Sequence, residues 1–190
     1  VAPMDDTQLL RYSRHILLPE LGIDAQEKFA DAHVLIVGAG GLGAPAAQFL
    51  AAAGIGTLTL CDPDAVDLTN LQRQILFATA DVGTRKVDAA KARLAAVNPD
   101  VRIETVPTRV GAAELAPLVA QADVVLDCSD NFATRHAVNR ACVAARECSA
   151  MHASGSRSTA PKDSVHATAW WPSIRSCSSW VVQRPAWTSA

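Results

Sequence analysis

The sequence has few cysteines, no long apolar run and no surplus of basic charge, and each shortage excludes a class of protein. Its five cysteines form no C-x-x-C pair, and an odd count argues against a disulfide framework. No apolar run reaches the ~18 residues that cross a bilayer, and the N-terminus shows no signal peptide. A net charge of −2 gives no basic footprint for nucleic acid. We therefore expect a cytoplasmic protein with neither a membrane nor a nucleic-acid partner.

The chain is rich in apolar residues: 49% of its 190 residues are hydrophobic, enough for one domain with a core. Composition changes sharply near residue 147, however. Residues 1–147 contain two serines and no tryptophan, whereas residues 148–190 contain ten serines and all four tryptophans. We therefore expect an ordered domain over 1–147, opening with a helical arm over 5–32, and an atypical tail over 148–190. A shifted reading frame, a gene remnant or disorder would each explain that tail.

One stretch, 33–62, organises the domain. It reads as a buried strand over 33–37, a glycine turn, a helix over 42–53 and a strand over 57–61. Glycine suits such a turn because the chain bends tightly there and a phosphate must approach the backbone closely. The helix directs its first N–H groups at the anion, and Asp62, after the second strand, can accept hydrogen bonds from a ribose. The glycines, spaced G-x-G-x-x-G with one more inside, are Gly38, Gly40, Gly41 and Gly43.

The remainder of the domain continues this alternation of strands and helices. Helices are predicted over 84–97 and 132–146, and strands over 101–106 and 123–128, with another helix between the two strands. This order predicts an α/β fold with a Rossmann-like, doubly wound, mostly parallel sheet. Right-handed crossovers place the last strand beside the first, so the residues that follow both strands face one crevice. The loop over 63–83 is long enough to be either functional or disordered.

Two short helices are predicted in the arm. Asp5 begins the first, which carries Arg11 and Arg14 on one face until Pro19 ends it. The second begins at Asp24 with a capping-box-like pattern and runs to about residue 32.

Polar residues gather where the crevice is predicted. The cations Arg73 and Lys86 and the amide Asn70 suit a triphosphate. Asp62 suits a ribose, and Asp130 suits Mg²⁺, which takes one or two carboxylates plus phosphate oxygens. The set therefore favours ATP over NAD, although Asp130 can alternatively cap the helix that follows it. Its members are Asp62, Asn70, Arg73, Lys86 and Asp130.

Five segments carry a resemblance to a known family. They are Arg11-Tyr-Ser-Arg-His-Ile, Gly38-Ala-Gly-Gly-Leu-Gly43, Asp62 to Gln74, Gly83-Thr-Arg-Lys86 and Asp127 to Arg135. In this combination they resemble the bacterial E1-like activating enzymes of the MoeB/ThiF/HesA family, most nearly the MoeB type. The resemblance covers about residues 7–146.

The resemblance implies ATP- and Mg²⁺-dependent adenylation of the C-terminal glycine of a ubiquitin-like sulfur-carrier protein, of the MoaD or ThiS type. It assigns the ribose to Asp62, and Mg²⁺ to Asp130 with Asn131 beside it in the nucleotide site. It also implies a homodimer in which Arg14 reaches the ATP of the partner subunit. The residues that it assigns to the phosphates are Asn70, Arg73 and Lys86. The expected catalytic residues are Arg14, Arg73, Lys86 and Asp130.

The tail departs from this family. Members of the family carry two C-x-x-C pairs that hold a structural zinc, followed by a carrier-binding sheet. Neither feature is recognisable in this sequence after residue 147. We therefore expect weak ATP binding and impaired carrier adenylation. Two alternatives stay open: an NAD-dependent Rossmann oxidoreductase, and a non-catalytic nucleotide-binding remnant.

Overall fold

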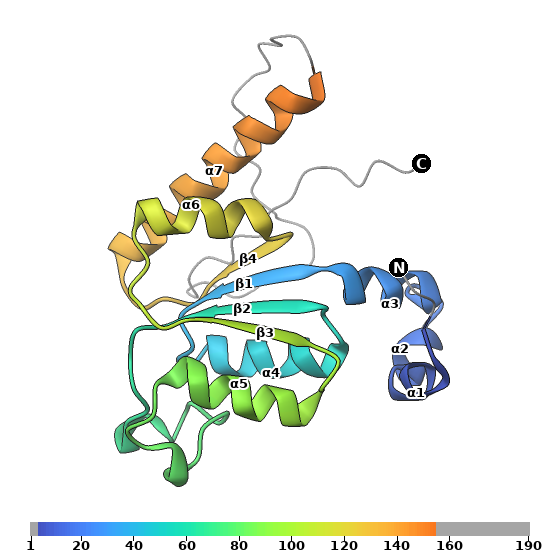
Figure 1. The fold of residues 1–190 in the computed structure, drawn as a ribbon, viewed down its shortest axis with the longest axis horizontal. Coiled ribbons are helices and arrows are strands. Elements are labelled where there is room, and N and C mark those ends of the chain that lie inside the picture. Colours follow the sequence, from blue (N-terminus) through green and yellow to red (C-terminus); the bar gives the residue numbers. More distant parts are fainter. Residues whose placement is uncertain (1–3, 155–190) are drawn as a thin grey trace, which may run out of the picture.

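Four parallel strands form the central sheet (Figure 1). The computed structural model describes residues 4–154, with side chains up to residue 145, so most of the predicted tail lies outside the described residues. The spatial order β3-β2-β1-β4 confirms that the last of these strands lies beside the first, as a Rossmann-like sheet requires. The strands are β1 (His33–Val37), β2 (Thr57–Cys61), β3 (Arg102–Val106) and β4 (Val124–Asp127).

Strand β1 is buried on both faces and has a neighbour on each side. Leu35 pairs with Thr59 of β2 and with Val125 of β4. Leu35 and Ile36 are both fully buried but belong to hydrophobic clusters on opposite faces of the sheet. A parallel strand covered on both faces needs apolar residues at every position, and the run His-Val-Leu-Ile-Val supplies them after its first residue.

Two pairs of helices cover the sheet, one pair on each face (Figure 1). One pair is α4 (Gly43–Ala53) and α5 (Lys86–Val97), and the other is α6 (Ala112–Gln121) and α7 (Phe132–Ser154). Helix α7 corrects the predicted end at residue 146. The prediction stopped where the composition changes, yet the next residues include alanine and methionine, which favour helix.

The N-terminal arm differs from its predicted form. Its first helix is broken at Tyr12 into α1 (Asp6–Arg11) and α2 (Ser13–Ile16), so Arg11 and Arg14 do not share one helix face. The break follows from burial. Tyr12 is 6% exposed, and its hydroxyl accepts a hydrogen bond of 2.8 Å from Asn98 Nδ2. Packing of the ring against the body therefore outweighs helix continuity.

Helix α3 (Gly22–Asp31) begins two residues earlier than predicted, and Asp24 lies in its first turn instead of capping it. The helix carries Gln26 inward, where its Nε2 donates to the Ala53 carbonyl over 2.8 Å. Because Ala32 directly joins α3 to β1, the arm lies at the amino end of that strand.

The loop after β2 is ordered by two short 3₁₀ turns, η1 (Leu68–Asn70) and η2 (Thr79–Asp81). It ends where α5 begins, at Lys86, two residues later than the start predicted at residue 84. Among the described residues, no helix is both long enough and apolar enough to cross a membrane.

Candidate functional site

A cavity of about 900 Å³ opens at the carboxyl ends of β1, β2 and β4. Its wall combines the glycine turn, the loop after β2, the start of α5 and the loop after β4. Every predicted nucleotide-binding residue except Gly43 lines it, so the predicted crevice exists. The predicted residues that line it are Gly38, Gly40, Gly41, Asp62, Asn70, Arg73, Lys86, Asp130 and Asn131.

The glycine turn needs glycine for two different reasons. Gly38 has a φ of 98°, and a Cβ there would lie 2.7 Å from the Cys128 carbonyl oxygen. A Cβ on Gly43 would collide with the Gly38 carbonyl, so this glycine lets α4 pack closely on the turn. Gly40 and Gly41 instead leave backbone open towards the cavity, where a phosphate can approach.

Asp62 is 5% exposed and holds the turn in place. Its Oδ2 accepts a hydrogen bond of 2.7 Å from the Ala39 N–H, and its Oδ1 accepts one of 2.9 Å from the Asp64 N–H. The carboxylate therefore fixes the backbone on both sides of the cavity floor, while its remaining lone pairs can accept ribose hydroxyls.

Lys86 is the first residue of α5 and is 5% exposed. Its Nζ lies 3.0 Å from Asp64 Oδ2 and 4.0 Å from Asp62 Oδ1. A buried ammonium at a helix N-terminus is doubly unfavourable without an anion, and these two acids supply one. Sequence reasoning missed Asp64, although its position two residues after Asp62 was a usable signal.

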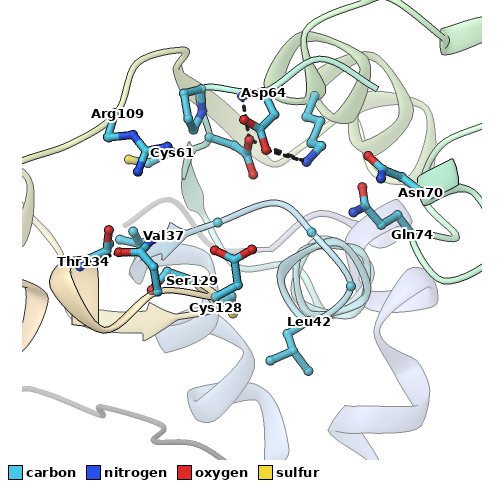
Figure 2. Close-up of a pocket in the computed structure, with 18 of the residues that line it drawn as sticks. Val37, Leu42, Cys61, Asp64, Asn70, Gln74, Arg109, Cys128, Ser129 and Thr134 are labelled. Atoms are coloured by element: carbon cyan, nitrogen blue, oxygen red, sulfur yellow. Dashed lines mark hydrogen bonds and ion pairs between the residues drawn. The ribbon is translucent and has the colours of Figure 1, made fainter. Parts of the chain in front are cut away.

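Residues around η1 form the far end of the cavity, where the Asn70 and Gln74 carboxamides lie together (Figure 2). Arg73 Nη1 donates to the Thr69 carbonyl over 3.3 Å, and its aliphatic carbons lie 3.7 Å from the Cβ position of Gly41. The guanidinium is thus held beside the glycine turn. Sequence reasoning did not identify Gln74 as a site residue either.

The loop after β4 is fastened by side chains. Asp127 Oδ1 accepts hydrogen bonds from the Ser129 backbone and hydroxyl, and Arg135 donates to the Ser129 carbonyl through Nε and Nη2 at 3.2 and 2.9 Å. Asn131 Oδ1 accepts from the Thr134 N–H and so caps α7, which corrects the alternative role given to Asp130.

The carboxylate of Asp130 is therefore available to a ligand. It is exposed at the cavity and makes no hydrogen bond or ion pair with the described part of the chain. A single such carboxylate suits Mg²⁺, whose other ligands are phosphate oxygens and water. Among the described residues, no group of three or more His, Cys, Asp or Glu side chains could hold a metal by itself.

Two thiols line the cavity, but their chemistry does not suit a nucleophile. Burial, with a smaller effect of Asp62, raises the pKa of Cys61 to about 12. Burial, with a smaller effect of Asp127, raises the pKa of Cys128 to about 11. Both thiols are therefore protonated near neutral pH.

Arg14 does not line the cavity. It is exposed on α2, in the arm at the amino end of β1, whereas the cavity lies at the carboxyl end (Figure 1).

A glycine turn, a strand-end acid, a buried lysine and an exposed carboxylate around one cavity are the features of a Rossmann-like nucleotide-binding domain. Comparison with known sequences agrees with this class. The sequence model of the ThiF family matches residues 12–169, and the chain belongs to that family. This membership confirms the resemblance drawn from the five segments.

Two relatives are about half identical to this chain. The sulfur carrier protein ThiS adenylyltransferase of Escherichia coli (strain K12) is 52% identical over 141 residues, which are 74% of this chain and 56% of the relative. The molybdopterin-synthase adenylyltransferase of the same strain is 49% identical over 146 residues, 77% of this chain and 59% of the relative. The chain thus spans little more than half the length of these relatives.

Solved structures share the fold and hold nucleotides. E. coli tRNA N6-threonylcarbamoyladenosine dehydratase, TcdA, in complex with ATP superposes with a TM-score of 0.70 at 33% identity, over 76% of this chain and 58% of that one. The complex of the same protein with AMP has the same score.

Proposed function

We propose that this domain binds ATP in the cavity and adenylates the C-terminal glycine of a ubiquitin-like sulfur-carrier protein. The observation that carries the proposal is one cavity that gathers Arg73, Lys86 and Asp130 around the glycine turn. The two relatives that are about half identical are named as the sulfur carrier protein ThiS adenylyltransferase and the molybdopterin-synthase adenylyltransferase, which supports an adenylation reaction. Because the chain spans only part of them, the activity is a proposal for the whole protein.

In the proposed reaction, a carboxylate oxygen of the carrier attacks the α-phosphorus of ATP. The new P–O bond forms as the bond to the bridging oxygen breaks, and pyrophosphate leaves with the electron pair. The carboxylate is already ionised near neutral pH, so no general base is needed. The barrier is mainly the meeting of two anions, which fixed positive charge lowers.

The cavity residues have separate roles in this scheme. Asp62 accepts the ribose hydroxyls while it holds the glycine turn, and Asn70, Arg73 and Lys86 bind the phosphates. Asp130 is the carboxylate that would hold Mg²⁺, which when bound neutralises phosphate charge. Asn131 supports Asp130 by capping α7 directly after it.

We also propose that the protein acts as a homodimer. Arg14 lies on α2 near the amino end of β1, whereas the cavity lies at the carboxyl end of that strand. It would therefore reach a triphosphate in a second copy of the chain. An arginine supplied in this way would stabilise charge on the leaving phosphates.

ATP–pyrophosphate exchange tests the proposal, with a ThiS-type and a MoaD-type carrier assayed separately. We expect carrier-dependent exchange that Asp130→Ala abolishes and that Asp88→Ala, an exposed acid of α5 outside the cavity, preserves. The absence of ATP binding would refute the proposal, and NAD binding tighter than ATP would favour the oxidoreductase alternative. If adenylation is impaired in this chain, its ATP–pyrophosphate exchange should be slower than that of a longer relative.

A further inference from the structure

Gln74 is a buried side chain whose hydrogen bonding is incomplete. It is 4% exposed. Among the residues that the structure describes, Gln74 Oε1 is the buried side-chain atom left without a hydrogen-bond partner. Leaving a buried amide oxygen unpaired costs free energy, so native proteins seldom keep one that has no use.

The backbone fixes where this side chain points. The Gln74 N–H donates to the Asn70 carbonyl over 3.0 Å, and the Gln74 carbonyl accepts from the Phe77 N–H over 3.1 Å. Gln74 Nε2 lies 3.6 Å from the Cβ position of Gly40, while the side chain of Arg73 lies over Gly41. Two consecutive residues therefore cover two consecutive glycines of the phosphate-binding turn.

The chemistry of this end of the cavity is that of an anion site. Gly40 and Gly41 line the cavity with no side chain of their own, Arg73 supplies a charge, and the Asn70 carboxamide lies beside that of Gln74 (Figure 2). Neither carboxamide donates or accepts a side-chain hydrogen bond within the described residues. A neutral amide adds a directed N–H donor without adding charge, which suits a phosphate oxygen beside an arginine.

We propose that Gln74 binds the terminal phosphates of ATP, the part that leaves as pyrophosphate. Gln74 Nε2 donates to a phosphate oxygen on the glycine turn, and Oε1 accepts from the Asn70 Nδ2 once the phosphate has aligned both amides. This assignment rests on the proposed function and adds to it a residue that distinguishes ATP from AMP. Its hydrogen bond strengthens as the bridging P–O bond breaks and charge moves onto the pyrophosphate.

The test compares ATP and AMP binding by calorimetry in the full chain carrying Gln74→Met or Gln74→Glu. Gln74→Met keeps the length of the side chain and removes both hydrogen-bonding groups, so ATP binding should weaken by about 3- to 10-fold, the usual value of one hydrogen bond. Gln74→Glu places a carboxylate beside the phosphates and should weaken ATP binding on the order of 30-fold or more. AMP, which lacks these phosphates, should bind each variant within about 2-fold of the unsubstituted chain.

Gln72 is the matched control, because it is an exposed glutamine two residues away that does not line the cavity. Gln72→Met and Gln72→Glu should leave both affinities unchanged. Equal losses for ATP and AMP, or no loss for ATP, would overturn the role of Gln74 and leave the proposed function standing. Failure of the unsubstituted chain to bind either nucleotide would instead refute the proposed function, and this role with it.

Discussion

At the residue scale, Lys86 is paired with an acid with which a bound phosphate would compete. Its Nζ contacts the Asp64 carboxylate at 3.0 Å, although Asp64 is largely exposed and Lys86 is not. A phosphate that binds Lys86 competes with this carboxylate for the same ammonium. Asp64 therefore has opposite effects on the stability of the fold and on nucleotide affinity.

Asp64→Asn should separate these two effects. We expect the free energy of unfolding to fall by about 1 kcal/mol, a value discounted because the acid is exposed to water. ATP should bind about 2- to 5-fold more tightly, because the phosphate no longer competes with a carboxylate. Urea unfolding and calorimetry measure the two quantities, with Asp88→Asn as a control for the loss of one acid. A weaker affinity for ATP would contradict the competition.

The buried thiols give a prediction about pH. Burial raises the pKa of Cys61 to about 12 and that of Cys128 to about 11 in the folded protein, from an ordinary value of 9.0 in the unfolded chain. Unfolding therefore releases protons above pH 9. Stability should therefore be unaffected by these thiols below pH 9 and fall as the pH rises towards 11, by about 1.4 kcal/mol per pH unit for each thiol.

Unfolding by urea between pH 8 and pH 11 measures that slope, and Cys61→Ala should make it shallower. Iodoacetamide at pH 8, followed by peptide mass spectrometry, should leave both thiols unmodified in the native protein. Rapid native labelling of Cys61 would show that its environment is not apolar.

At the element scale, the glycine turn contains positions of two kinds. Gly43→Ala should cost about 2–4 kcal/mol of stability, because the new methyl group meets backbone that cannot move without shifting α4. Gly41→Ala meets only flexible carbons of Arg73, at 3.7 Å, and should change stability by less than about 1 kcal/mol.

The loss of ATP affinity should not follow the order of the losses of stability in these two glycine variants. Gly41→Ala places a methyl group where a phosphate approaches the backbone, so we expect a folded protein with ATP affinity reduced on the order of 10-fold. Urea unfolding and calorimetry on the same samples make the comparison. A Gly41→Ala protein that binds ATP normally would mean that the phosphates lie elsewhere.

Elements were predictable where local sequence decides them. The strand over 33–37 is apolar after its first residue, and the strand over 57–61 alternates threonine with leucine. Both are bounded by turn residues, and the predicted ends of both match the structure. Helix boundaries in the arm were predicted wrongly, because they depend on distant contacts. No local rule indicates that Tyr12 packs on Gly54, where a Cβ would lie 2.5 Å from its ring.

At the scale of the whole molecule, a buried contact joins the arm to helix α4 and to the end of helix α5. Asn98 is fully buried, and its Nδ2 donates to the Tyr12 hydroxyl and to the Ala51 carbonyl, both over 2.8 Å. Residues far apart in sequence thus meet in one hydrogen-bonded cluster beside the end of α4.

This contact predicts graded losses of stability. Tyr12→Phe removes one hydroxyl and should cost about 1 kcal/mol, whereas Asn98→Ala leaves two partners unpaired and should cost about 2–4 kcal/mol. Urea unfolding measures both, and ATP affinity should change little, since the cluster lies outside the cavity. Asn98→Ala stability equal to that of the unsubstituted chain would show that the arm is not anchored there.

The candidate site was predictable in outline because strand order brings distant motifs together. Three separate segments bring four residues to one cavity: Asp62, Arg73, Lys86 and Asp130. Gln74 was missed because its role arises from a side-chain contact across Gly40 that spacing does not specify. Asp64 was missed although it lies two residues after Asp62, because its contact with Lys86 becomes visible only in the fold.

The contact between Lys86 and Asp64 also changes how salt should act on the site. The ammonium already holds a counter-ion from its own chain, so nucleotide binding there is an exchange of one anion for another. Exchange releases fewer dissolved ions than capture by a bare cation, and ATP affinity should therefore depend on salt less steeply than the number of cations in the cavity implies. The same exchange should also weaken the binding of free phosphate and sulfate at Lys86.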